Sequence, residues 1–228
     1  IAQIMRLDEN GNKKKLSKRD MGANLDDYSR MGYCAESVCE YVMTLLNSNY
    51  EEWHAKNPEL PYTDFPFSIK KMSVSGCLFD FDKLNDVSKN VLSRMTAEHV
   101  YDLTLAWAKE NDPDFAELLA RDAVYATSIL SIGRGGKKPR KDFARLSEVK
   151  DYMGFFYDEL FEIKDALPEQ FSKEDVKACI ADFAKNYDES LDNTGWFDSV
   201  KAVAERQGFC PDVKAYKQSP ESYKGHVG

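Results

Sequence analysis

The chain has 228 residues, of which 43% are hydrophobic and 31% charged, and its formal net charge is −8 at pH 7. This composition is typical of a soluble protein with a sizeable buried core. No apolar run reaches the ~20 residues that a membrane helix needs, and the acidic balance argues against a uniformly basic nucleic-acid binder. The first residues lack a signal-peptide pattern and do not begin with Met, so we expect a cytoplasmic fragment of a longer protein.

The cysteines and histidines form no recognisable site. Cys34 and Cys39 have no second pair nearby, which argues against zinc, and reduced thiols are the simplest account of the five cysteines. The three histidines are scattered, so no Ser/His/Asp or Cys/His arrangement can be proposed. We expect no metal site.

The chain opens with an apolar segment, residues 1–7, and a turn-like run, 8–12, which together predict a short strand or hairpin. A basic run, Lys13–Asp20, follows, with lysines on both sides of Ser17. Ammonium, hydroxyl and backbone N–H groups suit a polyphosphate. Taken alone, the run is more simply a solvated basic patch, because short motifs often match by chance.

Apolar residues at helical spacing predict a mainly α chain. Helices are expected at 25–31, closed by Gly32, and at 35–47. We expect the Pro-rich insertion at 48–67 to lack a continuous helix. After it, Asp82 is a candidate cap of a short helix, and Asp80 and Asp82, which flank Phe81, are both expected to have a capping role.

Further helices are predicted in the second half. Thr96 is an expected N-cap, and Asp112-Pro113 begins a helix that continues for about five turns to Leu130. Ser147 is expected to cap a helix that Pro168 ends, and Ser172 to cap another. A last helix covers 195–207 with Trp196 inward, and the remaining tail is unpatterned.

Positive charge is concentrated in one stretch. Residues 130–150 hold seven basic and two acidic side chains, a local charge of +5, whereas 155–192 hold eleven acidic side chains and four lysines. A basic island in an acidic protein is suited to a polyanion, although a solvated Gly/Lys loop explains it equally well.

The run Lys15-Leu16-Ser17-Lys18-Arg19 resembles the K-M-S-K-S signature of class I aminoacyl-tRNA synthetases, in the K-L-S-K-R form typical of glutamyl-tRNA synthetases. The resemblance continues through Tyr28, Gly32-Tyr33 and the helix at 38–46, and 79–84 is similar to that family's F-D-x-x-K-L segment. It covers residues 1–95 well and the remainder more loosely. Ala35 and Glu40 stand where the family usually has proline and asparagine.

The resemblance implies a mainly α fold with a short strand or hairpin at the N-terminus. Residues 1–24 would be the end of a catalytic domain with the signature loop (residues 15–19), and 25–95 a helical stem-contact region. Residues 96–165 would be a helical bundle that binds tRNA, and 166–228 the start of an α-helical, incomplete anticodon-binding domain.

The resemblance also implies chemistry. In that family ATP, with Mg²⁺, and glutamate form glutamyl-adenylate, and the glutamyl group then passes to the 3′ end of tRNA. Lys18 would stabilise charge on the departing pyrophosphate, which is electrostatic catalysis, and Lys15 and Ser17 would position the phosphates. Nothing in the chain resembles the family's H-I-G-H element, so we expect the isolated chain to be inactive in adenylate formation, with no cofactor bound.

The same resemblance assigns the basic stretch to the anticodon arm of tRNA. The expected tRNA-binding residues are Arg134, Lys137, Lys138, Arg140, Lys141 and Arg145, with Arg140 as the candidate for reading the third anticodon base. The expected partners are a glutamate-accepting tRNA, with the glutamine tRNA left open, together with glutamate and ATP in the full-length enzyme, and no membrane.

Two other hypotheses stay open at this point. One is a free-standing helical RNA-binding module without ATP chemistry, which would have no need of Lys15 and Lys18 around Ser17. The other is a helical protein–protein scaffold, in which the basic stretch would tolerate neutralisation.

Overall fold

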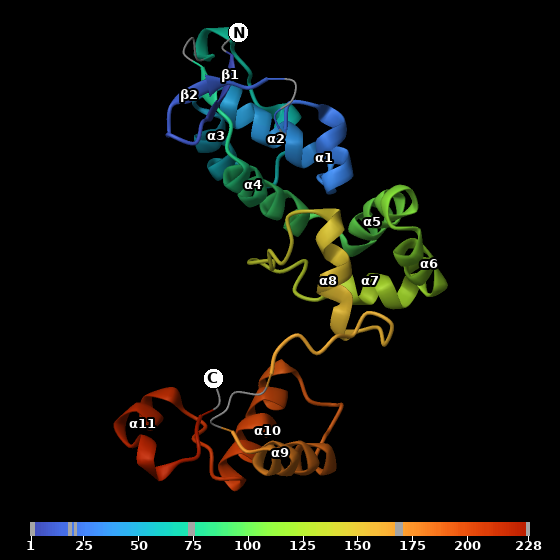
Figure 1. The fold of residues 1–228 in the computed structure, drawn as a ribbon, viewed down its shortest axis with the longest axis vertical. Helices are drawn as coiled ribbons and strands as arrows, with labels where there is room; N and C mark the ends of the chain where they lie inside the picture. The colour runs from blue at the N-terminus through green and yellow to red at the C-terminus, as the bar shows by residue number, and fades with distance from the viewer. Residues whose placement is uncertain (1–2, 18–19, 21, 73–75, 167–170, 227–228) are drawn as a thin grey trace. The chain divides into compact units, whose positions relative to one another are not determined.

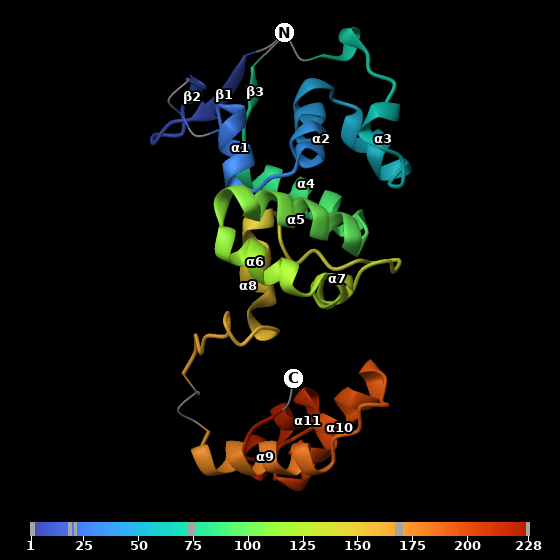
Figure 2. The same ribbon diagram turned by 90° about the vertical axis from the view of Figure 1, so that its right-hand side faces the viewer.

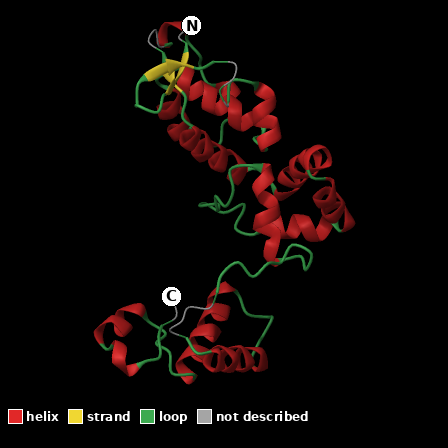
Figure 3. Cartoon of the chain, viewed as in Figure 1, coloured by secondary structure: helices red, strands yellow, loops and turns green. Residues whose placement is uncertain are grey.

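The computed structural model describes residues 3–17, 20, 22–72, 76–166 and 171–226. Contacts divide the chain into two compact units, Ile1–Glu162 and Ile163–Gly228. Helices dominate the described residues, so the prediction of a mainly α fold is confirmed (Figure 3). In that part of the chain, every helix is too short or too polar to cross a bilayer.

The N-terminal unit begins with a small sheet. Strand β1 (Ile4–Leu7) pairs antiparallel with β2 (Lys13–Lys15), as the predicted hairpin requires. The described residues also contain β3 (Cys77–Leu78), which pairs parallel with β1 and which the sequence did not predict. The sheet order is β2-β1-β3, so β1 is the central strand (Figure 1).

Helices α1 (Leu25–Met31) and α2 (Ala35–Leu46) follow the β1–β2 hairpin, and α4 (Phe81–Arg94) follows β3. Gly32 ends α1 in the left-handed region with φ 91°, as predicted from its position. The N-cap of α4 is Asp80, whose side chain accepts hydrogen bonds from two backbone N–H groups. The expected capping role is therefore confirmed for Asp80 and wrong for Asp82, which lies inside the helix. α2 packs against α4 around buried Tyr28, Tyr33, Tyr41 and Leu84.

The Pro-rich insertion is more ordered than predicted. It contains α3 (Tyr50–Lys56) and single 3₁₀ turns at Tyr62–Asp64 and Ile69–Lys71. The first proline of the insertion is Pro58, which comes after the last residue of α3, so no proline interrupts the seven residues of this helix. Tyr50 and Phe65 pack edge to face with ring centroids 5.2 Å apart, and both are buried.

A second helical layer completes this unit (Figure 2), with α5 (Ala97–Asn111), α6 (Pro113–Arg121) and α7 (Ala123–Ser131). Thr96 and Asp112 cap α5 and α6 as predicted. The prediction of one continuous helix to Leu130 was wrong, because Asp122 adopts φ −146° and ψ 89° and caps α7 with its side chain. The three helices enclose a core that includes Val100, Leu119 and Leu130.

The helix expected after Ser147 is much shorter than predicted. Among the described residues up to Ala166, the α-helix after Ser147 is limited to α8 (Val149–Tyr152), between 3₁₀ turns at Leu146–Glu148 and Met153–Phe155. Pro168, the predicted end of the helix, lies outside the described residues. The Ser147 hydroxyl does not cap it, because it donates to the carbonyl of Met31, 2.8 Å away. A tertiary contact therefore replaces the predicted local one.

The C-terminal unit contains α9 (Lys173–Lys185), α10 (Asn193–Arg206) and α11 (Val213–Gln218), with a 3₁₀ turn at Pro220–Ser222. Ser172 caps α9 as predicted. Two expectations were wrong: the tail after Gly208 carries a helix, and Trp196 is 45% exposed, its ring lying edge-on to Phe183.

Candidate functional site

The signature loop begins where β2 ends. Lys15 and Ser17 are exposed, and Lys18 and Arg19 lie outside the described residues. The backbone N–H of Ser17 donates to Asp20 Oδ2 at 2.7 Å, and the N–H of Asp20 donates back to the Ser17 carbonyl at 3.0 Å. These two hydrogen bonds join Ser17 directly to Asp20.

Asp20 is a residue that sequence reasoning missed, although an Asp three residues after Ser17 is a recognisable turn signal. Its Oδ1 forms an ion pair with Arg6 Nη2 on β1, 3.1 Å away. Hydrogen bonds from Ser17, followed by the one from Arg6, lower the pKa of Asp20 to about 2. The carboxylate is therefore ionised at neutral pH.

The chain on both sides of the loop is fixed. Before it, the N–H of Leu16 donates to the carbonyl of Ile4 at 3.0 Å, which extends the sheet ladder by one residue. After it, the Tyr28 hydroxyl donates to the carbonyl of Gly22 at 2.6 Å, and this bond is buried. The loop thus connects the sheet to α1 between two anchored points.

The second candidate surface is the basic loop, residues 133–145, between α7 and the turn at Leu146–Glu148. It folds back on itself, since the N–H of Arg140 donates to the carbonyl of Gly133 at 3.0 Å. Gly133 has φ 72°, and a Cβ there would lie 2.4 Å from Arg140 Cδ. Lys137, Lys138 and Lys141 are exposed on this loop.

The arginines of the basic loop are engaged within the protein. Arg134 Nε donates to the carbonyl of Leu130 at 2.7 Å, and Nη1 donates to the carbonyls of Leu92 and Met95. Burial lowers the pKa of Arg134. Its guanidinium therefore satisfies carbonyls at the ends of α4 and α7 rather than facing outward.

Arg140 and Arg145 each hold a neighbouring carboxylate. Arg140 contacts both oxygens of Asp142, with Nη2 2.7 Å from Oδ1, and this hydrogen bond raises the pKa of Arg140. Arg145 Nε donates to Glu148 at 2.8 Å. Burial opposes ionisation of Glu148, but the N–H of Ala144 and the Arg145 guanidinium lower its pKa overall.

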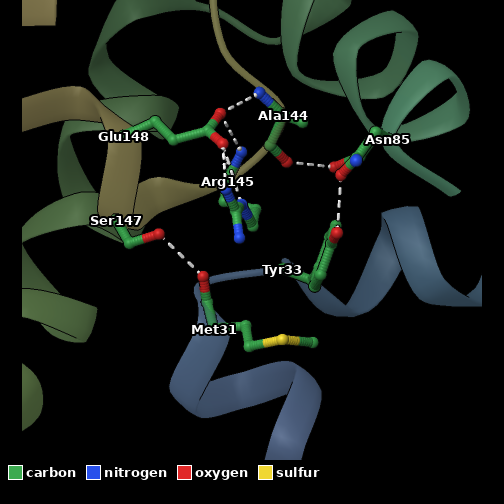
Figure 4. A network of polar contacts seen from close by, with 8 residues as sticks. Met31, Tyr33, Asn85, Ala144, Arg145, Ser147 and Glu148 are labelled. Atoms are coloured by element: carbon green, nitrogen blue, oxygen red, sulfur yellow. Dashed lines mark hydrogen bonds and ion pairs between the residues drawn. The ribbon is translucent and has the colours of Figure 1, made fainter. Parts of the chain in front are cut away.

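A polar network ties the end of the basic loop to the helices that follow the signature loop (Figure 4). The N–H of Leu146 donates to the Gly32 carbonyl at 2.7 Å, beside the contact from Ser147 to Met31. Nearby, Tyr33 donates to Asn85 Oδ1 at 2.6 Å. Both candidate surfaces therefore belong to one packed unit.

The described residues contain no group of three or more His, Cys, Asp or Glu side chains that could hold a metal ion. All five cysteines are free thiols. His54 Nε2 lies 3.4 Å from Glu40, whose other oxygen pairs with Arg94, so this histidine belongs to a structural cluster of α2, α3 and α4.

Comparisons with known proteins bear directly on the chain's identity. No protein-family model matches it. The glutamate–tRNA ligase of Acetivibrio thermocellus is 44% identical over 228 residues, which cover 100% of this chain and 42% of that protein. The glutamate–tRNA ligase of Clostridium perfringens strain 13 is 42% identical over 232 residues, with the same two coverages. The chain thus spans about two fifths of the length of these relatives.

A solved structure supports the fold. The crystal structure of a glutamate tRNA ligase from Elizabethkingia meningosepticum, in complex with its amino acid, matches 90% of this chain and 41% of that one with a TM-score of 0.52. At 18% sequence identity this likeness concerns the fold alone. The sequence matches, which span this whole chain, carry the conclusion: the chain is homologous over its entire length to a part of the glutamate–tRNA ligases.

Proposed function

We propose that this chain is the part of a glutamate–tRNA ligase that carries the signature loop and binds tRNA. The observation that carries the proposal is the 44% identity to such a ligase over the whole chain, including the signature loop. The free-standing RNA-binding module and the protein scaffold lose support, because neither accounts for that match.

In the full-length ligase, a glutamate carboxylate oxygen would attack the α-phosphorus of ATP, and the bond to the departing pyrophosphate would break. Lys18 would stabilise the charge that develops on the pyrophosphate. Lys15 and Ser17 are exposed, and the Lys15 ammonium and the Ser17 hydroxyl would hold the phosphates. A ribose hydroxyl at the 3′ end of tRNA would then attack the carbonyl carbon of the adenylate, lose its proton and release AMP.

Mg²⁺ is expected to accompany ATP in the family. The described residues offer no cluster of ligands for it, so we assign it no protein ligand in this chain and no step of the mechanism. We also propose that the chain alone does not form glutamyl-adenylate, because its sequence contains nothing that resembles the H-I-G-H element.

The basic loop is the proposed tRNA surface. Lys137, Lys138 and Lys141 are exposed and suited to phosphate contacts. Arg140 is held by Asp142, so its guanidinium is oriented and remains 61% exposed, as a base-reading arginine requires. Arg134 and Arg145 would act mainly by shaping the loop, since their guanidinium groups bind carbonyls and Glu148.

A filter-binding titration of this chain against total tRNA at two salt concentrations tests the proposal. We expect measurable binding at low salt that weakens as salt rises, and a large loss when the exposed cations Lys137, Lys138, Arg140 and Lys141 are neutralised. Undetectable binding at low salt, or unchanged affinity after neutralisation, would show that the chain is not the tRNA-binding part.

A further inference from the structure

We propose that Asp20 and Arg6 are positioning residues of the signature loop, which tie Ser17 to the central strand of the sheet. This inference rests on the proposed function, because it concerns how the same loop meets the ATP phosphates. It adds two residues outside the signature sequence to the machinery of glutamate activation.

Both oxygens of the Asp20 carboxylate are used. Oδ2 accepts the hydrogen bond from the Ser17 N–H at 2.7 Å, while Oδ1 pairs with Arg6 Nη2 at 3.1 Å. Arg6 lies on β1 directly opposite Lys14 of β2. The Asp20 side chain therefore links Ser17 of the signature loop to Arg6 on the sheet.

The Arg6–Asp20 pair differs from the ordinary ion pairs of the surface. The Asp20 side chain is 18% exposed and that of Arg6 34%, whereas Lys56 and Glu52 are each about 70% exposed in their pair on α3. Exposed pairs contribute little because water and salt screen them. The shielded pair is the better candidate for a fixed geometric role.

The position of this link suggests its purpose. Lys15 leaves the sheet opposite Met5, and Ser17 and Asp20 bracket the two residues, Lys18 and Arg19, that complete the signature. Fixing both bracketing residues lowers the entropy that must be lost when the loop meets the phosphates. Because preorganised donors act mainly on the transition state, the effect should fall on kcat for glutamate activation rather than on KM for glutamate.

The test uses the full-length ligase that contains this chain, with ATP–pyrophosphate exchange measured in the presence of tRNA. Asp20→Asn offers only one acceptor oxygen, so one of the two contacts is lost. Arg6→Met removes the ion pair but keeps the Ser17–Asp20 hydrogen bond, and Arg6→Lys restores the charge. Glu52→Gln removes a carboxylate from an exposed pair and is the matched control.

We expect Asp20→Asn and Arg6→Met to lower kcat by about tenfold or more, with KM for glutamate unchanged. Arg6→Lys should recover most of the loss, and Glu52→Gln should match the unmodified enzyme. Circular dichroism checks that each variant is folded. If Asp20→Asn fails to fold, the positioning role is tested by comparing the kcat of Arg6→Met with that of Arg6→Lys.

Two results separate the inference from the function on which it rests. If Lys18→Ala abolishes exchange while folded Asp20→Asn and Arg6→Met stay within twofold of the unmodified enzyme, the positioning role is wrong and the function stands. If Lys18→Ala also leaves exchange unchanged, the proposed role of the signature loop itself fails.

Discussion

Arg134 offers a sharp test of the difference between a structural and a binding arginine. Its guanidinium donates to the carbonyls of Leu92, Met95 and Leu130, which lie at the ends of two helices. It also lies 5.6 Å from the centroid of the Phe143 ring. Substitution by Met keeps the bulk of the side chain but removes every donor, so the three carbonyls lose their partner.

The size of the effect follows from these contacts. A hydrogen bond to a charged group contributes ~1.5–3 kcal/mol. Three such bonds do not add fully here, because the guanidinium loses hydration on burial, as its lowered pKa indicates, and carbonyls at helix ends regain water after the substitution. We therefore expect Arg134→Met to lower the free energy of unfolding by about 2–3 kcal/mol.

Urea unfolding followed by tryptophan fluorescence measures this loss. The chain has two units, and Trp196 belongs to the C-terminal one, so a Trp196→Phe background restricts the signal to Trp53 and Trp107 of the N-terminal unit. The matched control is Lys138→Gln on the same loop, which should change stability by less than about 0.5 kcal/mol. Equal stability of the two variants would refute the structural role of Arg134.

Three further predictions concern local features of the fold. Gly32→Ala should destabilise the N-terminal unit by at least about 1 kcal/mol in urea unfolding, because φ is 91° and the new Cβ would lie 2.7 Å from the Ser147 nitrogen; Gly135→Ala, which has φ 73° but no atom within 4 Å, should cost less. Asp80→Ala should cost about 1 kcal/mol through loss of the α4 N-cap, and a value near zero would contradict the cap assignment. Hydrogen bonds from Arg206 and then Gln207 lower the pKa of Asp182, so the contribution of this carboxylate to stability is complete above the ordinary Asp pKa of ~3.9 and is lost as pH falls below it. Asp182→Asn should therefore weaken the fall of the melting temperature of the C-terminal unit at acid pH. An unchanged acid dependence would count against the pairing of Asp182 with Arg206 and Gln207.

The helix ends that depend on local chemistry were predictable from the sequence. Thr96, Asp112 and Ser172 cap helices because their side chains accept hydrogen bonds from the N–H groups three residues ahead, which needs no tertiary partner. The end of α1 at Gly32 was also predictable from local chemistry, since only glycine enters the left-handed region freely.

The errors arose where another element decides the outcome. The apolar stripe continues across Asp122, so periodicity alone did not reveal that this residue breaks one helix and caps the next. Ser147 looked like a cap, but its hydroxyl is taken by Met31, more than a hundred residues earlier in the chain. The parallel pairing of β3 with β1 joins segments about 70 residues apart and has no local signal.

The candidate site shows the same limit. Sequence reasoning selected the signature loop and the basic loop by residue type, but residue type cannot tell an outward arginine from an inward one. The structure turns Arg134 towards helix ends, pairs Arg140 with Asp142, and leaves Lys137, Lys138 and Lys141 exposed. It also adds Asp20, whose proposed positioning role depends on its ion pair with Arg6, a tertiary contact that the sequence does not reveal.

The most direct test of the central claim is the salt dependence of tRNA binding by this chain. Each phosphate contact contributes ~0.7–0.9 to the slope of log affinity against log salt. Replacing Lys137, Lys138 and Lys141 together by glutamine should therefore reduce that slope by about two to three. Neutralising three exposed cations elsewhere in the same unit, Lys56, Lys109 and Arg121, should leave it unchanged. Equal slopes for the two triple variants would contradict the assignment of the basic loop to tRNA.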